Sequence, residues 1–228
     1  MVSDLKVEPT RLRSPKRSSR TSDAVIRFFA QLFSFVFHPL FMTSYVAAFL
    51  IFLHPQAFAG FSERDKIFRF FTVFFTTTFL PAFSVFLLWR LKLFVNTVSL
   101  RSNRERIIPY VIAMIFYFWV WWVFYNLSDS PPAMVHFTLG AFLAVCSAWM
   151  CNIFFKISMH ATAVGGMLMF FILLCLNDSY GSGLYLSLAL LVTGLVCSSR
   201  LLLSDHSPFE IYTGLAVGIA SQFVAWQF

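Results

Sequence analysis

Seven apolar segments, each close to the length needed to cross a membrane, restrict what this chain can fold into. A helix needs roughly 20 apolar residues to cross the hydrocarbon core of a bilayer. The segments are Val25–Leu53, Phe68–Trp89, Ile107–Leu127, Ala133–Phe155, His160–Leu176, Leu184–Leu203 and Phe209–Phe228. In lipid such segments must be helical, because a transmembrane barrel would show an alternating ten-residue pattern instead. The sequence therefore predicts an all-α polytopic membrane bundle of six or seven transmembrane helices.

Composition excludes the soluble alternatives. Hydrophobic residues make up 59% of the chain, charged residues 12%, and Phe alone occurs 31 times, whereas a soluble domain is roughly 25% charged. A soluble fold of this length leaves about a third of its unfolded surface exposed, so it cannot hide so many large side chains. The four cysteines lie in or beside apolar segments without metal-ligand spacing, and we interpret them as small buried hydrophobes. A soluble enzyme and a disulfide scaffold are both excluded.

Residues 1–23 differ from the rest, because they are rich in Ser, Arg and Lys and have no apolar periodicity. Such a segment buries too little to order itself, so we predict a flexible basic tail ahead of a single transmembrane domain at 24–228. Within that domain, His38-Pro39 interrupts the first apolar segment. It predicts either a tilted, kinked helix or an interfacial turn leading into a shorter one. Gly214-x-x-x-Gly218 in the last segment predicts close helix packing.

The Lys and Arg residues predict the orientation in the membrane. In a seven-span arrangement all but three of the 17 lie at one face, the exceptions being Arg64, Lys66 and Arg69. Cytoplasmic loops carry an excess of Lys and Arg. This face and the N-terminal tail are therefore expected to be cytoplasmic, and the protein is expected in a bacterial cytoplasmic (inner) membrane. The positive charge serves orientation here, so we expect no nucleic acid as a partner.

Three short polar stretches interrupt the apolar sequence at that same face, at residues 101–109, 156–161 and 199–210. Together they offer several guanidinium groups, one ammonium, two imidazoles and a carboxylate. Ionisable groups at a membrane edge are costly and indicate function. Arginine forks match phosphate oxygens, and helix N-termini attract anions. Such cations beside a pair of histidines favour phosphoryl chemistry on a lipid.

The third stretch carries the most specific motif. Ser199 and Arg200 are followed by five residues, His206, three residues and Glu210. This pattern resembles the SRxxxxxHxxxD signature of the type 2 phosphatidic acid phosphatase superfamily, which includes membrane lipid phosphatases and haloperoxidase-related enzymes. Glu210 stands where that family has Asp.

The second stretch is similar to the PSGHA element of the same family. Ser158, His160 and Ala161 match it, while Ile157 and Met159 replace the Pro and the Gly. The order of the elements and their shared membrane face agree with the family. The resembling core runs from about residue 100 to 215.

The first stretch matches the family's KxxxxxxRP element least well. Arg101 aligns with the Lys and Pro109 with the Pro, but Ile108 replaces the Arg. Arg104 lies one turn before Ile108, and Lys156 lies one turn before His160. Either cation is placed to supply the missing phosphate ligand.

The resemblance implies metal-independent hydrolysis of a phosphate monoester in two steps, with no cofactor. His206 would attack phosphorus and form a phosphohistidine, and Glu210 would hold its ring. His160 would protonate the leaving alkoxide and then activate water. The phosphoryl oxygens would be bound by the remaining polar residues, Arg200, Arg101, Arg104, Lys156, Ser158 and Ser199.

The same residues have structural interpretations. Ser207-Pro208-Phe209-Glu210 matches a helix N-cap, a proline at N1 and a capping-box Glu at N3, and Glu210 can fill both roles. Residues 101–106 can form a solvated loop, and Lys156 can extend to the interface without touching phosphate. The histidines without polar company are interpreted as structural: His38, His54 and His136.

We therefore expect a membrane enzyme, a phosphoric monoester hydrolase acting on a lipid phosphate of the phosphatidic acid or phosphatidylglycerol phosphate type. If the first apolar segment does not cross, the site faces outward, and polyprenyl (undecaprenyl) diphosphate becomes the better substrate. A non-catalytic lipid-phosphate binder or transporter with the same fold is the alternative that Ile108 and Glu210 favour. A haem carrier fits poorly, because the candidate histidines are not centred in facing spans. Membrane lipids and the lipid phosphate are the expected partners.

Overall fold

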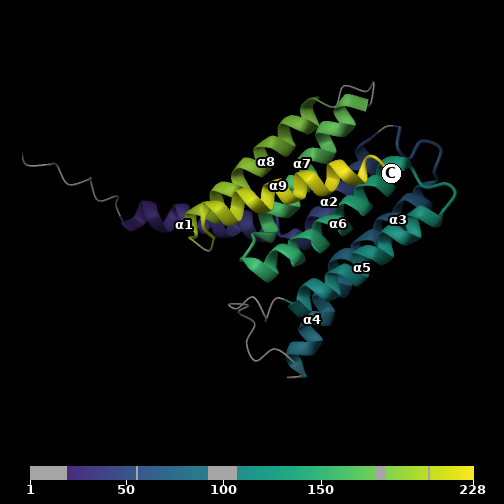
Figure 1. The fold of residues 1–228 in the computed structure, drawn as a ribbon. Coiled ribbons are helices and arrows are strands. Elements are labelled where there is room, and N and C mark those ends of the chain that lie inside the picture. The colour runs from purple at the N-terminus through teal and green to yellow at the C-terminus, as the bar shows by residue number, and fades with distance from the viewer. Residues whose placement is uncertain (1–19, 55, 92–106, 178–182, 205) are drawn as a thin grey trace, which may run out of the picture.

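The computed structural model describes residues 20–54, 56–91, 107–177, 183–204 and 206–228, so most of the predicted tail lies outside it. These residues fold into a bundle of helices without β-strands (Figure 1). In chain order, with η marking π-helical turns, the elements are α1 (Arg20–Val36), α2 (Pro39–Ala48), η1 (Phe49–Leu53), α3 (Glu63–Phe74), η2 (Phe75–Phe79), α4 (Leu80–Arg90), α5 (Ile107–Asn126), α6 (Pro132–Phe154), α7 (Met159–Asn177), α8 (Gly183–Leu202) and α9 (Pro208–Ala225). The prediction of an all-α, multi-pass membrane bundle is confirmed.

Within the described ranges, 5 helices are long and apolar enough to cross a membrane. They are the continuous unit α3–η2–α4 and the helices α5, α6, α7 and α8. The pair formed by α1 and α2–η1 makes a sixth span if it crosses as one unit. α9 corresponds to the seventh predicted segment, but Glu210 and Gln222 lower its hydropathy, and it is not in this group.

The first apolar segment is broken at His38-Pro39, which confirms the predicted interruption. The helix of residues 24–36 and the helix Pro39–Leu53 meet at 62°. The backbone of His38 is extended, with φ −64° and ψ 140°, and its Nδ1 accepts a hydrogen bond of 3.4 Å from the Leu40 N–H. His38 therefore caps α2. α1 extends beyond the end of the bundle at which α8 ends and α9 begins (Figure 1).

Helices α7 and α9 pack closely enough to bring their backbones together. A Cβ atom added to Gly214 would lie 2.7 Å from the Ser158 carbonyl oxygen, and one added to Gly218 would lie 2.0 Å from the Thr162 oxygen. Both distances are shorter than any normal contact, so only glycine fits. The close packing predicted from Gly214-x-x-x-Gly218 is confirmed, and it brings the N-terminal ends of α7 and α9 side by side.

Buried hydroxyl groups join α2 to η2. Thr78 Oγ1 donates to the Leu40 carbonyl at 2.7 Å and lies 2.9 Å from Ser44 Oγ. In a hydrocarbon environment a hydroxyl without a partner is costly, and the Leu40 carbonyl and the Ser44 hydroxyl supply partners for Thr78. These contacts hold the start of α2, just after the break, against the continuous unit α3–η2–α4.

Candidate functional site

A cavity of about 450 Å³ lies at the end of the bundle where α8 ends and α9 begins. Four of its lining residues are basic: His38, His160, Arg200 and His206. The rest of the lining comes from α2, α4 and α5 and from Ile157 and Met159, and it is apolar except for Tyr110. The second and third polar stretches of the sequence thus meet in one cavity, as their predicted shared membrane face requires.

His206 is oriented by Glu210. Its Nδ1 lies 2.5 Å from Glu210 Oε2, and the two side chains are 7% and 21% exposed. A carboxylate oxygen accepts, so Nδ1 carries the hydrogen and Nε2 keeps its lone pair. Glu210 can hold this position because Ser207 caps α9, with its Oγ 3.3 Å from the Glu210 N–H, and Pro208 follows at the start of the helix. The N-cap at Ser207 and the proline after it are thus confirmed, and the Glu210 carboxylate pairs with His206.

The surroundings of His206 act on its pKa in opposite directions. Burial lowers the pKa of this imidazole, since it disfavours the charged form, and the hydrogen bond to Glu210 raises it. The positive charges of Lys156 and Arg200 lower the pKa further. The net result is a pKa below the ordinary value, so His206 is neutral at physiological pH. A neutral imidazole has the lone pair that a nucleophile needs.

His160 is oriented by a backbone carbonyl from another part of the chain. Its Nε2 lies 3.0 Å from the carbonyl oxygen of Ser34, near the end of α1. A carbonyl oxygen only accepts, so Nε2 carries the hydrogen and Nδ1 has the lone pair. The ring of His38 stands edge-on to that of His160, with centroids 5.3 Å apart.

Arg200 is the common electrostatic partner of the imidazoles. It lies in the last turn of α8, and its charge acts on His38, His160 and His206. Lys156, which is half-buried, acts on His206 but does not line the cavity. Arginine and lysine charges within reach of the same imidazoles make this the natural place for an oxyanion.

The hydroxyl groups predicted to bind phosphate have structural partners instead. Ser158 is fully buried and caps α7, with its Oγ 3.4 Å from the Ala161 N–H. Its own N–H donates to the Glu210 carbonyl at 3.3 Å, which ties the start of α7 to α9. Ser199 Oγ donates to the Leu195 carbonyl at 2.7 Å within α8. Both serines position the cavity without lining it.

The two arginines predicted to bind phosphate from the first stretch, Arg101 and Arg104, lie outside the described residues. The end of that stretch is described: Pro109 and Tyr110, in the first turn of α5, line the cavity. The structure therefore brings this part of the first stretch to the other two.

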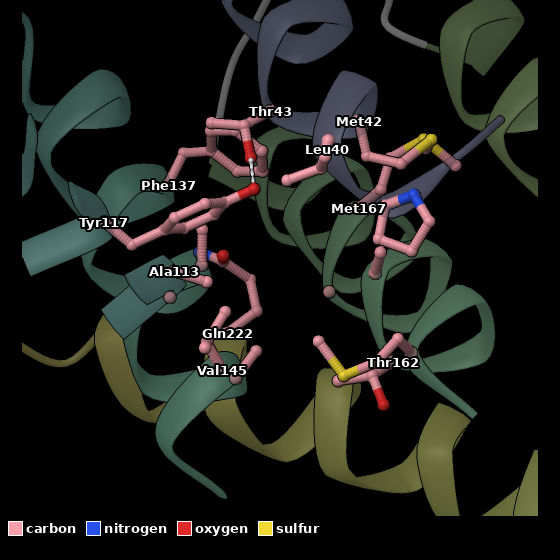
Figure 2. Close-up of a pocket in the computed structure, with 17 residues that line it drawn as sticks. Leu40, Met42, Thr43, Ala113, Tyr117, Phe137, Val145, Thr162, Met167 and Gln222 are labelled. Atoms are coloured by element: carbon pink, nitrogen blue, oxygen red, sulfur yellow. Dashed lines mark hydrogen bonds between the residues drawn. The ribbon is translucent and has the colours of Figure 1, made fainter. Parts of the chain in front are cut away.

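A smaller and more apolar cavity adjoins the first. It measures about 80 Å³ and shares Pro39, Leu40, Ala113 and Met159 with the larger one. Figure 2 shows Met42, Phe137, Val145 and Met167 around it, with Gln222 reaching in from α9. Thr43 donates to the Tyr117 hydroxyl at 3.3 Å, which satisfies one polar group in this wall. A cavity with four basic side chains next to a smaller, more apolar one suits an amphiphilic molecule.

Sequence reasoning missed two contributors to the site, His38 and the Ser34 carbonyl. His38 was interpreted as structural because no charged residue lies near it in the sequence. Its place beside His160 depends on tertiary packing, and the only signal in the sequence was the kink expected at Pro39. A backbone carbonyl leaves no residue-type signal at all.

Comparison of the chain with protein families, curated proteins and solved structures finds no match. Among the residues that the structure describes, no group of three or more His, Cys, Asp or Glu side chains is arranged to hold a metal ion. The chemistry open to the cavity is that of two differently oriented imidazoles and their neighbouring cations.

Proposed function

We propose that this protein is an integral membrane phosphatase of the type 2 phosphatidic acid phosphatase superfamily. Its substrate is a lipid phosphate monoester of the phosphatidic acid or phosphatidylglycerol phosphate type. The observation that carries the proposal is the convergence of His160, Arg200 and His206 on one cavity, with Nδ1 of His206 engaged by Glu210. These are residues of the two sequence elements that resemble the family most closely.

In the first step, Nε2 of His206 attacks phosphorus in line with the ester oxygen. The N–P bond forms as the P–O bond to the lipid breaks. His160, which is neutral in the free protein and takes up a proton on Nδ1 when the phosphate group binds, gives that proton to the leaving alkoxide. Glu210 stabilises the positive charge that the ring of His206 acquires. Arg200 and Lys156 oppose the negative charge on the phosphoryl oxygens.

In the second step, a water molecule attacks the phosphohistidine. His160, now neutral, takes a proton from the water, the P–N bond breaks, and inorganic phosphate leaves. His206 recovers its lone pair and His160 its proton, so the cycle closes without an external acid, base or metal ion.

The apolar surroundings support a lipid rather than a water-soluble ester. The cavity lies at one end of a bundle of membrane-spanning helices, and the smaller apolar cavity continues from it. Such a site can hold a charged headgroup at the bilayer boundary while the chains stay in an apolar environment.

We place the cavity on the cytoplasmic side of a bacterial inner membrane, with the N-terminal tail on the same side, because of the excess of Lys and Arg at that end. Single cysteines at Ser204, beside the cavity, and at Glu63, at the far end of α3–η2–α4, test this in a chain whose four native cysteines are replaced. An impermeant thiol reagent added to intact cells is expected to label Glu63→Cys only. Labelling of Ser204→Cys instead would reverse the orientation.

Phosphate release by the purified protein tests the activity. Lipid monophosphates and polyprenyl diphosphates are compared in one panel, with vanadate as a mimic of the five-coordinate transition state. We expect hydrolysis of monophosphates that vanadate inhibits, no detectable rate for His206→Ala, and a fall of about 10²–10⁴-fold for His160→Ala. His54→Asn is the matched control, because His54 is a buried histidine at the other end of the same α2–η1 helix.

The outcomes separate the alternatives. Preference for polyprenyl diphosphate over every monophosphate would move the substrate to the lipid-carrier class. Binding of lipid phosphates without release of phosphate from any of them would make the protein a binder or transporter. Equal loss of activity in His54→Asn and His160→Ala would remove the support for a specific site.

A further inference from the structure

The break between α1 and α2 releases a backbone carbonyl from its helix. In a continuous helix the N–H of residue 38 would bond to the carbonyl of Ser34. Here the His38 N–H bonds instead to Phe35 O at 3.3 Å, and the Ser34 oxygen accepts from His160 Nε2 at 3.0 Å. Pro39 maintains the break, because its ring cannot donate a hydrogen bond and clashes with a continuing helix.

This contact determines which nitrogen of His160 reacts. With Nε2–H held by a carbonyl, Nδ1 carries the lone pair in the neutral ring. The charged or titratable groups that act on His160 are Arg200 from α8, His206 from the turn before α9, and His38 from the break itself. None of them supplies a carboxylate, so the Ser34 carbonyl is the acceptor that fixes the ring.

The same break carries a third imidazole into the cavity. His38 uses Nδ1 as an acceptor for the Leu40 N–H, so the hydrogen of its neutral ring is on Nε2. The ring lines the cavity with Arg200 and His206 and stands edge-on to His160. An N–H donor therefore belongs to the cavity lining, in addition to the cation of Arg200.

We infer that the break at His38-Pro39 is a working part of the site: the Ser34 carbonyl positions His160 as the proton donor, and His38 donates a hydrogen bond to the phosphoryl group. This inference rests on the proposed phosphatase activity. It extends the site to the N-terminal segment, which carries none of the three resembling elements.

Pro39→Ala tests the positioning of His160. An N–H at residue 39 lets α1 continue into α2, so that the Ser34 oxygen returns to the His38 N–H. Proton donation matters when the leaving group is an alkoxide and matters little for p-nitrophenolate. First-turnover release of a lipid leaving group is therefore expected to fall about 10-fold more than release of p-nitrophenolate, as expected for losing one orienting hydrogen bond. Displacement of His38 together with the break slows both substrates alike and leaves this ratio unchanged.

A purely structural role predicts a different pattern for Pro39→Ala. If the break only shapes the fold, both leaving groups are released more slowly by the same factor. If the break has no role, neither rate changes. Either result overturns the inference for His160.

His38→Asn tests the third imidazole separately. Asn is among the best helix N-caps, so this variant keeps the cap on α2 and removes only the ring. Inhibition by vanadate is expected to weaken about 10-fold, the effect of one hydrogen bond to a charged group. The thermal unfolding midpoint is expected to match the wild type, whereas His38→Ala lowers it. Unchanged inhibition by vanadate in His38→Asn overturns this half of the inference.

A spectroscopic measurement separates this inference from the proposed function. The ¹⁵N chemical shifts of a neutral imidazole distinguish the two tautomers, and they need no substrate. We expect His160 to be in the Nε2–H form in the wild type and to become a mixture in Pro39→Ala. If the wild type hydrolyses nothing but shows this change, the proposed function fails and the positioning role stands. If the wild type is active and the shifts do not change, the positioning role fails alone.

Discussion

His206 and His160 line the same cavity, yet different kinds of acceptor fix their rings. His206 is held by the carboxylate of Glu210, four residues along the chain, and His160 is held by the neutral carbonyl of Ser34, 126 residues away. A carboxylate stabilises positive charge on its ring, as a ring bonded to phosphorus requires. A neutral carbonyl orients a ring without holding its proton, which suits an acid that must release it. The two acceptors thus match the two roles that we propose, His206 as the nucleophile and His160 as the proton donor.

The largest effect on folding and stability is expected from a change that displaces the rings of His160 and His206 together. Gly218→Leu would force α9 away from α7, since a Cβ alone would lie 2.0 Å from the Thr162 carbonyl oxygen. Such overpacking costs about 1–3 kcal/mol or more, and backbone cannot move aside as a side chain can. We expect a much lower yield of folded protein and a lower unfolding midpoint. Gly194→Ala on α8 is the control, because a Cβ there has no atom within 4 Å; similar midpoints for the two variants would contradict close α7–α9 packing.

Removing the Glu210 carboxylate changes the support of His206 and leaves the contact between His160 and Ser34 intact. Glu210→Gln keeps the size of the side chain but loses the charge that supports His206. A hydrogen bond to a charged group contributes about 1.5–3 kcal/mol, so the first-turnover rate is expected to fall roughly 10- to 100-fold. Unlike Pro39→Ala, this variant is expected to slow release of p-nitrophenolate and of a lipid leaving group equally, because His206 attacks in both cases. If Glu210→Gln slowed only the lipid substrate, His206 would be the proton donor and His160 the nucleophile.

The pH dependence sharpens the assignment of His206. As the proposed nucleophile it must be neutral, so kcat/KM is expected to fall as the pH drops through its pKa, which lies below the ordinary histidine value. Glu210 raises that pKa, whereas Lys156 and Arg200 lower it. The acidic limb is therefore expected to move to lower pH in Glu210→Gln and to higher pH in Lys156→Gln, each by less than about one unit. Shifts of the same sign in both variants would exclude His206 as the titrating group.

The smallest effect is expected at the turn that separates Arg200 from His206. Ser204 has φ 55°, in the left-handed region that costs a residue with a Cβ about 1–2 kcal/mol. Ser204→Gly relieves this cost but makes the unfolded chain more flexible, so we expect a gain of at most about 1 kcal/mol in unfolding free energy. Activity should not change, because neither acceptor moves. Lower stability would show that the Ser204 side chain holds the turn.

The sequence was sufficient wherever neighbouring residues determine the structure. The apolar segments, the break at Pro39, the Gly214-x-x-x-Gly218 contact and the cap on α9 all depend on residues a few positions apart. The spacing of His206 and Glu210, one helical turn, belongs to the same group. The number of membrane-spanning helices is harder to predict from the sequence. Gln222 lowers the hydropathy of α9, although its side chain packs inside the bundle.

The parts of the site that sequence did not reveal depend on distant contacts or on main-chain atoms. Ser158 and Ser199 matched motif positions, but their hydroxyls bond to the backbone, a preference that serine shows in many helices. His38 has no charged neighbour in the sequence, and only the fold brings it beside His160 and within reach of the charge of Arg200. The identity of the residue at position 34 is almost irrelevant to its contact with His160, because any amino acid offers the same oxygen.

The hydrogen bond from His160 to Ser34 also affects how short a fragment of the chain can be and still be active. A polypeptide starting at residue 100 would retain all three resembling elements and still lack the carbonyl that orients its proposed proton donor, His160. A truncation designed from the motif boundaries alone would then give an inactive fragment. The inactivity would be attributed wrongly to the three elements rather than to the missing Ser34 carbonyl. Co-expressing residues 1–99 as a separate piece is the way to restore such a fragment.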